Sequence, residues 1–125
     1  MRPVLLAVAL SILSTGPSIA ASLVYECRFE TTCSAHTCTQ SDPARDMVYR
    51  LDDDGSAWSV NPIRDHAVTA SAGKGVVSFV QDVAGRIRAT TVLSNGRAVH
   101  SSHSVFREDI VAIQSFGSCQ KTEAL

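Results

Sequence analysis

The sequence predicts an all-β domain, an antiparallel meander of about eight strands that forms a small barrel or clam and is stapled by two disulfides. Three observations predict it. Segments rich in Val, Ile, Thr and Phe alternate between apolar and polar residues, as half-buried strands do. Asp-Gly and Asn-Gly dipeptides separate such segments, as in β-hairpins. Four cysteines lie in a short chain that begins like an exported protein. A two-sheet sandwich is the alternative architecture.

The first 20 residues have the features of a secretory signal peptide. Arg2 gives a positive start, residues 4–13 are apolar, and small residues precede the Ala20–Ala21 bond, where we expect cleavage. The apolar run is shorter than the roughly 20 residues of a membrane span. We therefore expect a signal peptide over 1–20 and a periplasmic or secreted protein.

The segment 21–125 is long enough for a single β domain. Without Arg2 it has 10 basic and 12 acidic residues, a formal net charge of −2. The basic residues are spread along the chain, and no second apolar run is long enough to span a bilayer. We therefore expect no nucleic-acid partner and no membrane span after signal cleavage.

All four cysteines lie beyond the predicted signal peptide, so two disulfides are expected and three pairings are possible. Cys33 and Cys38 bracket a short loop that one bridge can close. Cys27 and Cys119 would then join the first strand to the last, and so long a closed loop stabilises by about 4 kcal/mol in the chain-entropy model. We predict the pairs Cys27–Cys119 and Cys33–Cys38.

The first strand of the domain alternates cleanly. Its apolar face carries Leu23, Tyr25, Cys27 and Phe29, and its polar face carries Glu26, Arg28 and Glu30. The polar segment 31–45 that follows predicts a long loop, with a short helical turn that Asp42 caps and Pro43 begins. Loops of this length often carry function, although a disulfide-closed loop can also be a stapled connection.

A second hairpin is expected over residues 47–62, around a two-residue type I′ turn at Asp54-Gly55. This closure puts Leu51 opposite Trp58, on the face that carries Tyr49. We therefore expect Trp58 in the core and not as a binding platform.

The third pair of strands covers 67–72 and 76–83. Its second strand has apolar residues on both faces, at Val76, Val77, Phe79 and Val80. A domain with one core covers one of these faces, so the Cys33–Cys38 loop, a partner or a ligand must cover the other. These four residues are the predicted binding surface, because exposed apolar patches mark interaction sites.

The fourth hairpin spans 86–106 around Asn95-Gly96, and a turn at Glu108-Asp109 leads to the last strand, 110–119. A two-residue turn at Asn95-Gly96 makes Arg88 and His103 neighbours, whereas a three-residue loop breaks this pairing. The two-residue turn gives a polar cluster of Arg88, His103, Thr90 and Ser101. This cluster either recognises an anion or is a solvated sheet face.

No motif in the sequence indicates a catalytic or metal site, so we expect no enzyme, no metal and no cofactor. The histidines are His36, His66, His100 and His103. His100 and His103 point to opposite faces of a regular strand, and the cysteines are used in disulfides. There is no Gly-x-Ser-x-Gly elbow, 52–55 lacks the spaced ligands of a calcium loop, and 73–75 is too short to cradle phosphate.

Two terminal motifs carry a resemblance. Tyr25-Glu26-Cys27-Arg28-Phe29, followed by Cys33 and Cys38, and Phe116-Gly117-Ser118-Cys119-Gln120 resemble small uncharacterised exported proteins of proteobacteria. The resemblance implies a fold and a compartment without an activity. The chain is also similar to periplasmic lysozyme inhibitors, which are small β-barrels with a disulfide that ties their ends. Their Ser-Gly-x-Arg-Tyr type of loop is missing, because no aromatic residue follows 70–75. No inhibitory residue is therefore carried over.

The expected function is a small binding or interaction module of the bacterial envelope, which holds a small apolar ligand or another envelope protein. A structural or accessory envelope protein without a ligand pocket is the first alternative, and a lysozyme-inhibitor-like protein is the second. An open concave site favours the binding module. A core filled by Tyr49, Trp58, Phe79 and Phe106 favours the structural protein.

Overall fold

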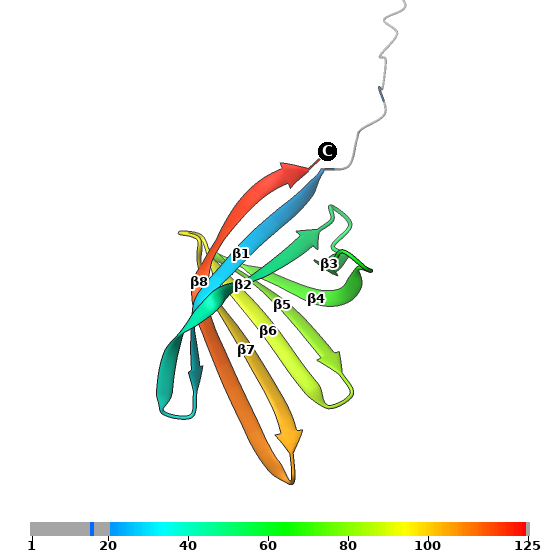
Figure 1. Ribbon diagram of the computed structural model, residues 1–125. Helices are drawn as coiled ribbons and strands as arrows, with labels where there is room; N and C mark the ends of the chain where they lie inside the picture. The colour runs from blue at the N-terminus through cyan, green and yellow to red at the C-terminus, as the bar shows by residue number, and fades with distance from the viewer. Residues whose placement is uncertain (1–15, 17–20, 125) are drawn as a thin grey trace, which may run out of the picture.

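A computed structural model describes residue 16 and residues 21–124. The predicted signal peptide lies almost entirely outside these residues. The eight strands are β1 (Ser22–Ser34), β2 (Thr37–Leu51), β3 (Ala57–Val60), β4 (His66–Gly73), β5 (Val76–Val83), β6 (Arg86–Leu93), β7 (Arg97–Phe106) and β8 (Asp109–Ala124). Each strand is antiparallel to the next, and β8 pairs with β1 to close a barrel (Figure 1). The all-β meander is confirmed, and the architecture is the barrel.

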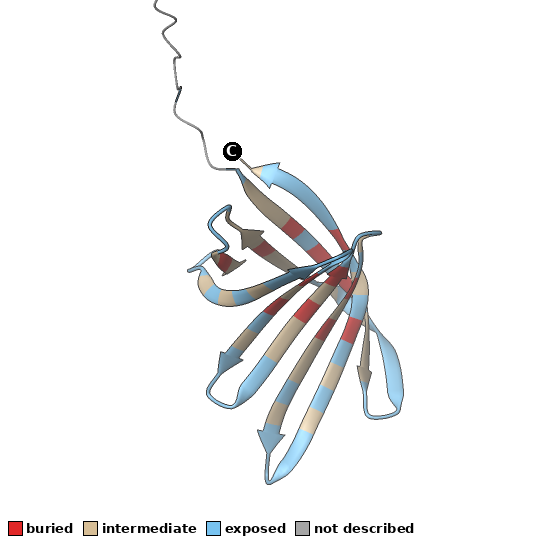
Figure 2. Ribbon diagram, turned by 180° about the vertical axis from the view of Figure 1, so that it is seen from behind, coloured by how far each residue is buried: buried red, intermediate tan, exposed pale blue. Residues whose placement is uncertain are grey.

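Alternation along the strands decides which side chains fill the barrel. In β1, Tyr25, Cys27 and Phe29 are buried while the residues between them are exposed, as predicted. Phe79 of β5 lies at the centre of the core, where the ring of Tyr49 stacks on it at 4.6 Å and the ring of Tyr25 meets it edge-on at 5.3 Å. Figure 2 shows that buried residues lie where the strands converge and that the hairpin tips are exposed.

Both predicted disulfides are present. Cys27–Cys119 joins directly opposed residues of β1 and β8, with 92 residues of sequence separation, and so it ties the seam of the barrel. Cys33–Cys38 joins β1 to β2 near the tip of their hairpin. Two disulfides and no free cysteine in the described chain fit an oxidising compartment.

The prediction of a loop with a helical turn over 31–45 is wrong. β1 continues to Ser34, β2 begins at Thr37, and only a two-residue turn separates them. The part of this segment up to Ser34 is extended because β1 pairs with β8 as far as the Ser34–Ile113 pair. The backbone hydrogen bonds between these strands hold its polar residues in the sheet. The irregular part is a bulge in β2 between Gln40 and Arg45, and Pro43, which has no N–H to donate, lies in it.

The turns at Asp54-Gly55 and Asn95-Gly96 are one residue longer than predicted. In each loop only the glycine has a positive φ, +88° at Gly55 and +87° at Gly96, whereas a type I′ turn needs two such residues. The backbone N–H two residues further on donates to the side chain of Asp54 or Asn95, at 2.9 and 3.0 Å. These side-chain bonds stabilise three-residue loops, which shift the strand register by one residue.

Trp58 is consequently not in the core. Leu51 pairs with Ala57, which is buried, and Trp58 pairs with Arg50 on the outer face of the barrel. There the indole Nε1–H donates to Asp52 Oδ2 at 3.0 Å, and the Arg50 guanidinium lies 5.7 Å from the ring centroid. The turn predicted at Glu108-Asp109 also moves by one residue, because the two residues between Phe106 and Asp109 form it.

The short strand β3 leaves the barrel wall incomplete on one side. β3 pairs with β2 only from Val48 to Leu51, so residues 45–47 of β2 pair with β1 alone. On the other side, the pairing of β4 with β5 ends at Val80, and residues 81–83 of β5 pair with β6 alone. β2 and β5 therefore border an opening into the barrel interior.

Candidate functional site

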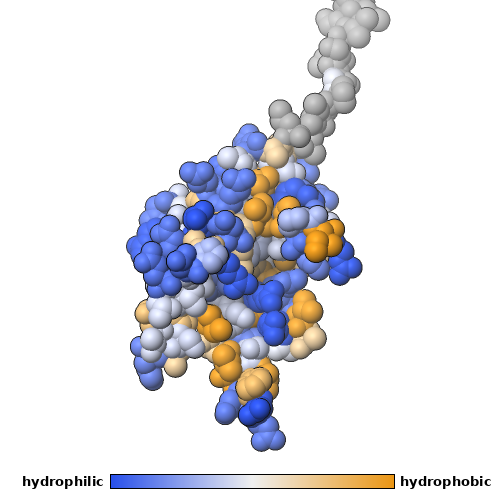
Figure 3. All heavy atoms as spheres, viewed as in Figure 1, coloured by the Kyte–Doolittle hydropathy of each residue, from blue (hydrophilic) through white to orange (hydrophobic). Residues whose placement is uncertain are grey.

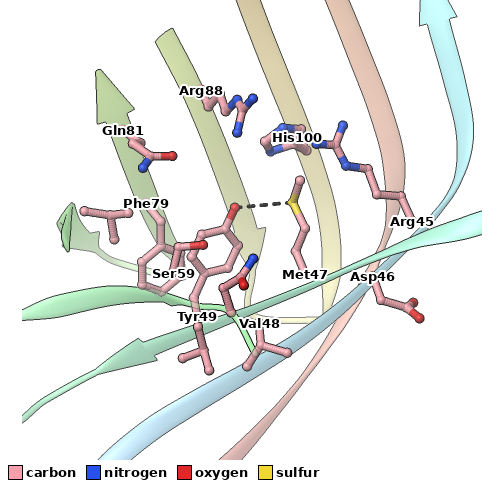
Figure 4. Close-up of a pocket in the computed structure, with 13 residues that line it drawn as sticks. Arg45, Asp46, Met47, Val48, Tyr49, Ser59, Phe79, Gln81, Arg88 and His100 are labelled. Atoms are coloured by element: carbon pink, nitrogen blue, oxygen red, sulfur yellow. Dashed lines mark hydrogen bonds between the residues drawn. The ribbon is translucent and has the colours of Figure 1, made fainter. Parts of the chain in front are cut away.

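A cavity of about 200 Å³ lies in the barrel interior beside this opening. β2, β5, β6 and β7 supply the side chains that give it its chemical character. These are Arg45, Tyr49, Phe79, Gln81, Arg88 and His100 (Figure 4). Alternation explains their convergence, because each of these positions points inward on its strand.

His100 is the buried polar residue at the wall of the cavity, with 2% of its surface exposed. Its Nδ1 lies 2.8 Å from Thr90 Oγ1, which lies 2.6 Å from the Tyr49 hydroxyl. The other ring nitrogen, Nε2, is buried and has no hydrogen-bond partner in the described chain. Buried polar atoms are nearly always paired, and leaving one unpaired costs about 1–3 kcal/mol.

The hydrogen-bond chain Tyr49–Thr90–His100 has two self-consistent directions, because a neutral imidazole has one donor and one acceptor nitrogen. In one direction Tyr49 donates to Thr90 and Thr90 donates to Nδ1, so Nε2 carries the proton. In the other, Nδ1–H donates to Thr90, Thr90 donates to Tyr49, and Tyr49 donates to Met47 Sδ at 3.4 Å. Either direction leaves Nε2 without a partner from the described chain.

Two arginines give the cavity a positive charge. Figure 4 shows Arg45 of β2 and Arg88 of β6 on either side of His100. The ion pairs of the described chain use other arginines, Arg28 and Arg50. Asp46 also borders the cavity, but it points away from the arginines in Figure 4 and lies 3.7 Å from Arg28 on the outer face.

The environment keeps His100 neutral. Burial is the larger cause, the charges of Arg45 and Arg88 add to it, and together they lower the pKa of His100 from 6.5 to about 4. Burial also raises the pKa of the Tyr49 hydroxyl, although its bond to Thr90 and the same two arginines oppose this shift. At neutral pH the interior side of the cavity therefore presents the two guanidinium cations, the neutral imidazole and the neutral Tyr49 hydroxyl, and the carboxylate of Asp46 is directed to the outer face.

The structure divides the predicted binding surface between two faces of β5. Val77 and Phe79 are buried in the barrel, and Val76 and Val80 are each 37% exposed on its outer face. Of the four, only Phe79 borders the polar cavity, whereas Val76 and Val77 border a separate open depression. The tip of the Cys33–Cys38 hairpin pairs with β8 and does not pair with β5.

The predicted pairing of Arg88 with His103 is wrong, because the Asn95-Gly96 loop has three residues. Arg88 pairs with Ser102, and His100 replaces Ser101 as the partner of Thr90. His103 is exposed, so the two histidines lie on opposite faces of β7, as predicted. The sequence thus indicated two members of the site, Arg88 and Thr90.

Sequence reasoning missed His100 and Arg45 as site residues. His100 is two positions from the inward residue Ala98, so strand alternation places both on the inner face. This alternation was the signal in the sequence that could have indicated His100. Arg45 was assigned to a loop, so no face could be given to it.

Within residues 21–124, no group of three or more His, Cys, Asp or Glu side chains is placed to hold a metal ion. The described residues include no helix with the length and hydropathy needed to cross a membrane.

Comparison with known proteins gives no neighbour for this chain: no family model matches it, and no curated protein or solved structure is detectably similar to it.

Proposed function

We propose that this chain is an exported binding protein of the periplasm or the extracellular medium and that the polar cavity holds a small ligand. One observation carries the proposal: His100 borders the cavity, and its Nε2 atom is buried without a partner from the described chain. A ligand atom that bonds to this nitrogen would offset the cost of its burial.

The scaffold suits this role. Two disulfides and a closed ladder of strands hold the side chains in place, and the short strand β3 leaves an entrance between β2 and β5. A cavity of about 200 Å³ is smaller than the roughly 300–1,000 Å³ of pockets that hold drug-sized molecules. The ligand is therefore a small molecule.

The filled core that would favour a structural or accessory protein is incomplete. Tyr49 and Phe79 lie inside the barrel, but Trp58 packs on the outer face and Phe106 is 62% exposed at the end of β7. Two of the four aromatic side chains expected to fill the core are therefore absent from the barrel interior.

A second candidate function is recognition of another envelope protein by the β7–β8 hairpin. Val105 and Ile110 form a cross-strand pair near its tip and are 69% and 78% exposed. Figure 3 shows apolar side chains among polar ones in this lower part of the molecule. If this hairpin binds an apolar surface, replacing both residues with serine should weaken binding of a hydrophobic dye, whereas unchanged dye binding would count against it.

The proposed ligand site can be tested by nuclear magnetic resonance with a library of small charged and neutral compounds. We expect binding compounds to shift the signals of Tyr49, Phe79 and His100. Gln81→Leu, at the cavity wall, should weaken this binding, and His103→Gln, on the outer face of β7, should not. A library that leaves the cavity signals unchanged would contradict the proposed function.

A further inference from the structure

We infer that the ligand is a small organic acid whose carboxylate lies between the guanidinium groups of Arg45 and Arg88 and accepts a hydrogen bond from His100 Nε2–H. This inference rests on the proposed function and adds the chemical class of the ligand. Three features of the cavity carry it: its charge, the direction of its hydrogen bonds and its apolar wall.

The charge of the cavity selects an anion. Arg45 and Arg88 approach the site from strands on opposite sides of His100, and neither is in an ion pair of the described chain. The one carboxylate at the rim, Asp46, is directed to the outer face toward Arg28. Arg88 is half-buried and Arg45 is exposed, and an anion between the two guanidinium groups offsets their mutual repulsion.

A bound carboxylate also fixes the direction of the hydrogen bonds. A carboxylate oxygen is only an acceptor, so Nε2 must carry the imidazole proton and Nδ1 must accept. Thr90 then donates to Nδ1 across 2.8 Å, and Tyr49 donates to Thr90 across 2.6 Å. In this arrangement every polar hydrogen of the Tyr49–Thr90–His100 hydrogen-bond chain has an acceptor, and the ligand supplies the acceptor for Nε2–H.

The rest of the wall favours an organic anion over an inorganic one. Phe79, Met47 and Val68 border the same cavity from three strands. A phosphate or sulfate ion has no apolar group to contact these side chains, whereas a short alkyl group attached to a carboxylate would contact them. The ligand thus has an anionic end toward the arginines and an apolar end toward Phe79.

Butyrate, butyramide and inorganic phosphate separate these contributions, because butyramide has nearly the shape of butyrate without its charge. Binding of each probe is measured from the side-chain ¹⁵N signals of His100, which also report the tautomer. We expect butyrate to bind at least about tenfold more tightly than butyramide or phosphate and to fix the proton on Nε2.

Charge variants show whether the two arginines act directly. Arg45→Gln and Arg88→Gln should each weaken butyrate binding by roughly tenfold or more. Arg97→Gln removes the same charge from an exposed position on β7 and should leave binding unchanged. An equal loss in Arg97→Gln would mean general attraction of anions to the surface and would overturn the inference.

The outcomes separate this inference from the proposed function. If butyramide or phosphate binds at His100 as tightly as butyrate, the cavity is a ligand site but the inferred ligand class is wrong. If butyrate binds only away from His100, the inference is also overturned. If none of the probes and no compound of the library changes the cavity signals, the proposed function fails as well.

Discussion

His100 combines two properties at one residue: it is almost fully buried, and it keeps a nitrogen without a protein partner in the described chain. The ring of Phe29 lies 5.9 Å from the imidazole, and Thr90 fixes its Nδ1 edge. A residue that served only to fill the core would be an apolar side chain at this position. The polar group is costly unless its second nitrogen is used.

The lowered pKa of His100 predicts a loss of stability at mildly acidic pH. The folded protein holds the residue neutral to about pH 4, while the unfolded chain takes up the proton near 6.5. The contribution of His100 to the free energy of unfolding is therefore fully present above pH 6.5 and is lost as the pH falls from 6.5 to 4. The total loss is about 3 kcal/mol. Urea unfolding across this range should show the loss in the wild-type protein.

His100→Gln is the matched variant for this measurement, because it keeps a polar side chain and cannot titrate. Between pH 7 and pH 4 the free energy of unfolding of the wild-type protein should fall by about 3 kcal/mol relative to that of His100→Gln. The hydrogen bond from Ser22 first, and then Trp58 and Arg50, lower the pKa of the Asp52 carboxyl, and its contribution to stability below about pH 5 is common to both proteins and cancels in the difference. Parallel pH profiles of the two proteins would contradict the prediction.

Gly117 allows the backbones of β8 and β1 to approach closely. A Cβ at this position would lie 1.9 Å from the carbonyl oxygen of Arg28 and 2.7 Å from the Cα of Phe29, where the register of the two strands shifts. Backbone atoms cannot move aside as a flexible side chain can. We expect Gly117→Ala to lower the free energy of unfolding by about 3 kcal/mol or more.

Gly73→Ala is the control for this substitution. Gly73 also lies in a strand, but a Cβ there meets no atom within 4 Å. Its stability change should stay within about 0.5 kcal/mol of zero. If denaturant unfolding gives equal effects for the two variants, the close approach at Gly117 is not what the glycine provides.

At the scale of strands and turns, composition and alternation predicted the eight strands, and cysteine spacing predicted both disulfides. The inward positions of Tyr25, Cys27 and Phe29 followed from the same alternation. What failed was the register across the two dipeptide turns. Asn-Gly and Asp-Gly occur in both two-residue and three-residue loops. Which loop forms depends on contacts with distant strands, such as the hydrogen bond that the Cys119 N–H donates to the Gly96 carbonyl at 2.7 Å.

The register error explains why the site was only half predicted. One residue of shift exchanges the inner and outer faces of a strand, so it moved Trp58 outward and aligned His100 with Thr90. Arg45 was missed for another reason. The segment around it is polar and contains Pro43, and only its pairing with β1 holds it in an extended strand.

The outer position of Trp58 predicts a moderate effect of its removal. Trp58→Ala would lose one hydrogen bond to Asp52 and the contact with Arg50, which we expect to cost about 1–2 kcal/mol. Phe79→Ala, in the centre of the barrel, should cost about 3–5 kcal/mol. Denaturant unfolding of both variants tests this difference, and an equally large loss for Trp58→Ala would place the indole in the core after all.

At the scale of the whole molecule, the two disulfides differ in what they close. Cys27–Cys119 links residues 92 apart and ties the β1–β8 seam, whereas Cys33–Cys38 links residues 5 apart within one hairpin. The chain-entropy model gives about 4–5 kcal/mol for the first bridge and about 2 kcal/mol for the second. Urea unfolding of the two double alanine variants should rank them in this order, and a larger loss for the Cys33–Cys38 pair would contradict it.

The interior of the barrel is apolar near the Cys27–Cys119 bridge and polar beside the opening between β2 and β5. Tyr25, Val92 and Ala98 are buried in the apolar part. The polar part contains the Tyr49–Thr90–His100 chain. The proposed ligand site thus lies at the polar end of the barrel, away from the apolar end that the Cys27–Cys119 bridge closes.

A crystal structure of the protein grown with butyrate would show whether the polar end of the barrel holds a small ligand that bonds to His100, as proposed. We expect the carboxylate between Arg45 and Arg88, with one oxygen within hydrogen-bonding distance of His100 Nε2 and the alkyl chain against Phe79. A cavity closed by a rearranged protein side chain that bonds to Nε2 itself would contradict the claim.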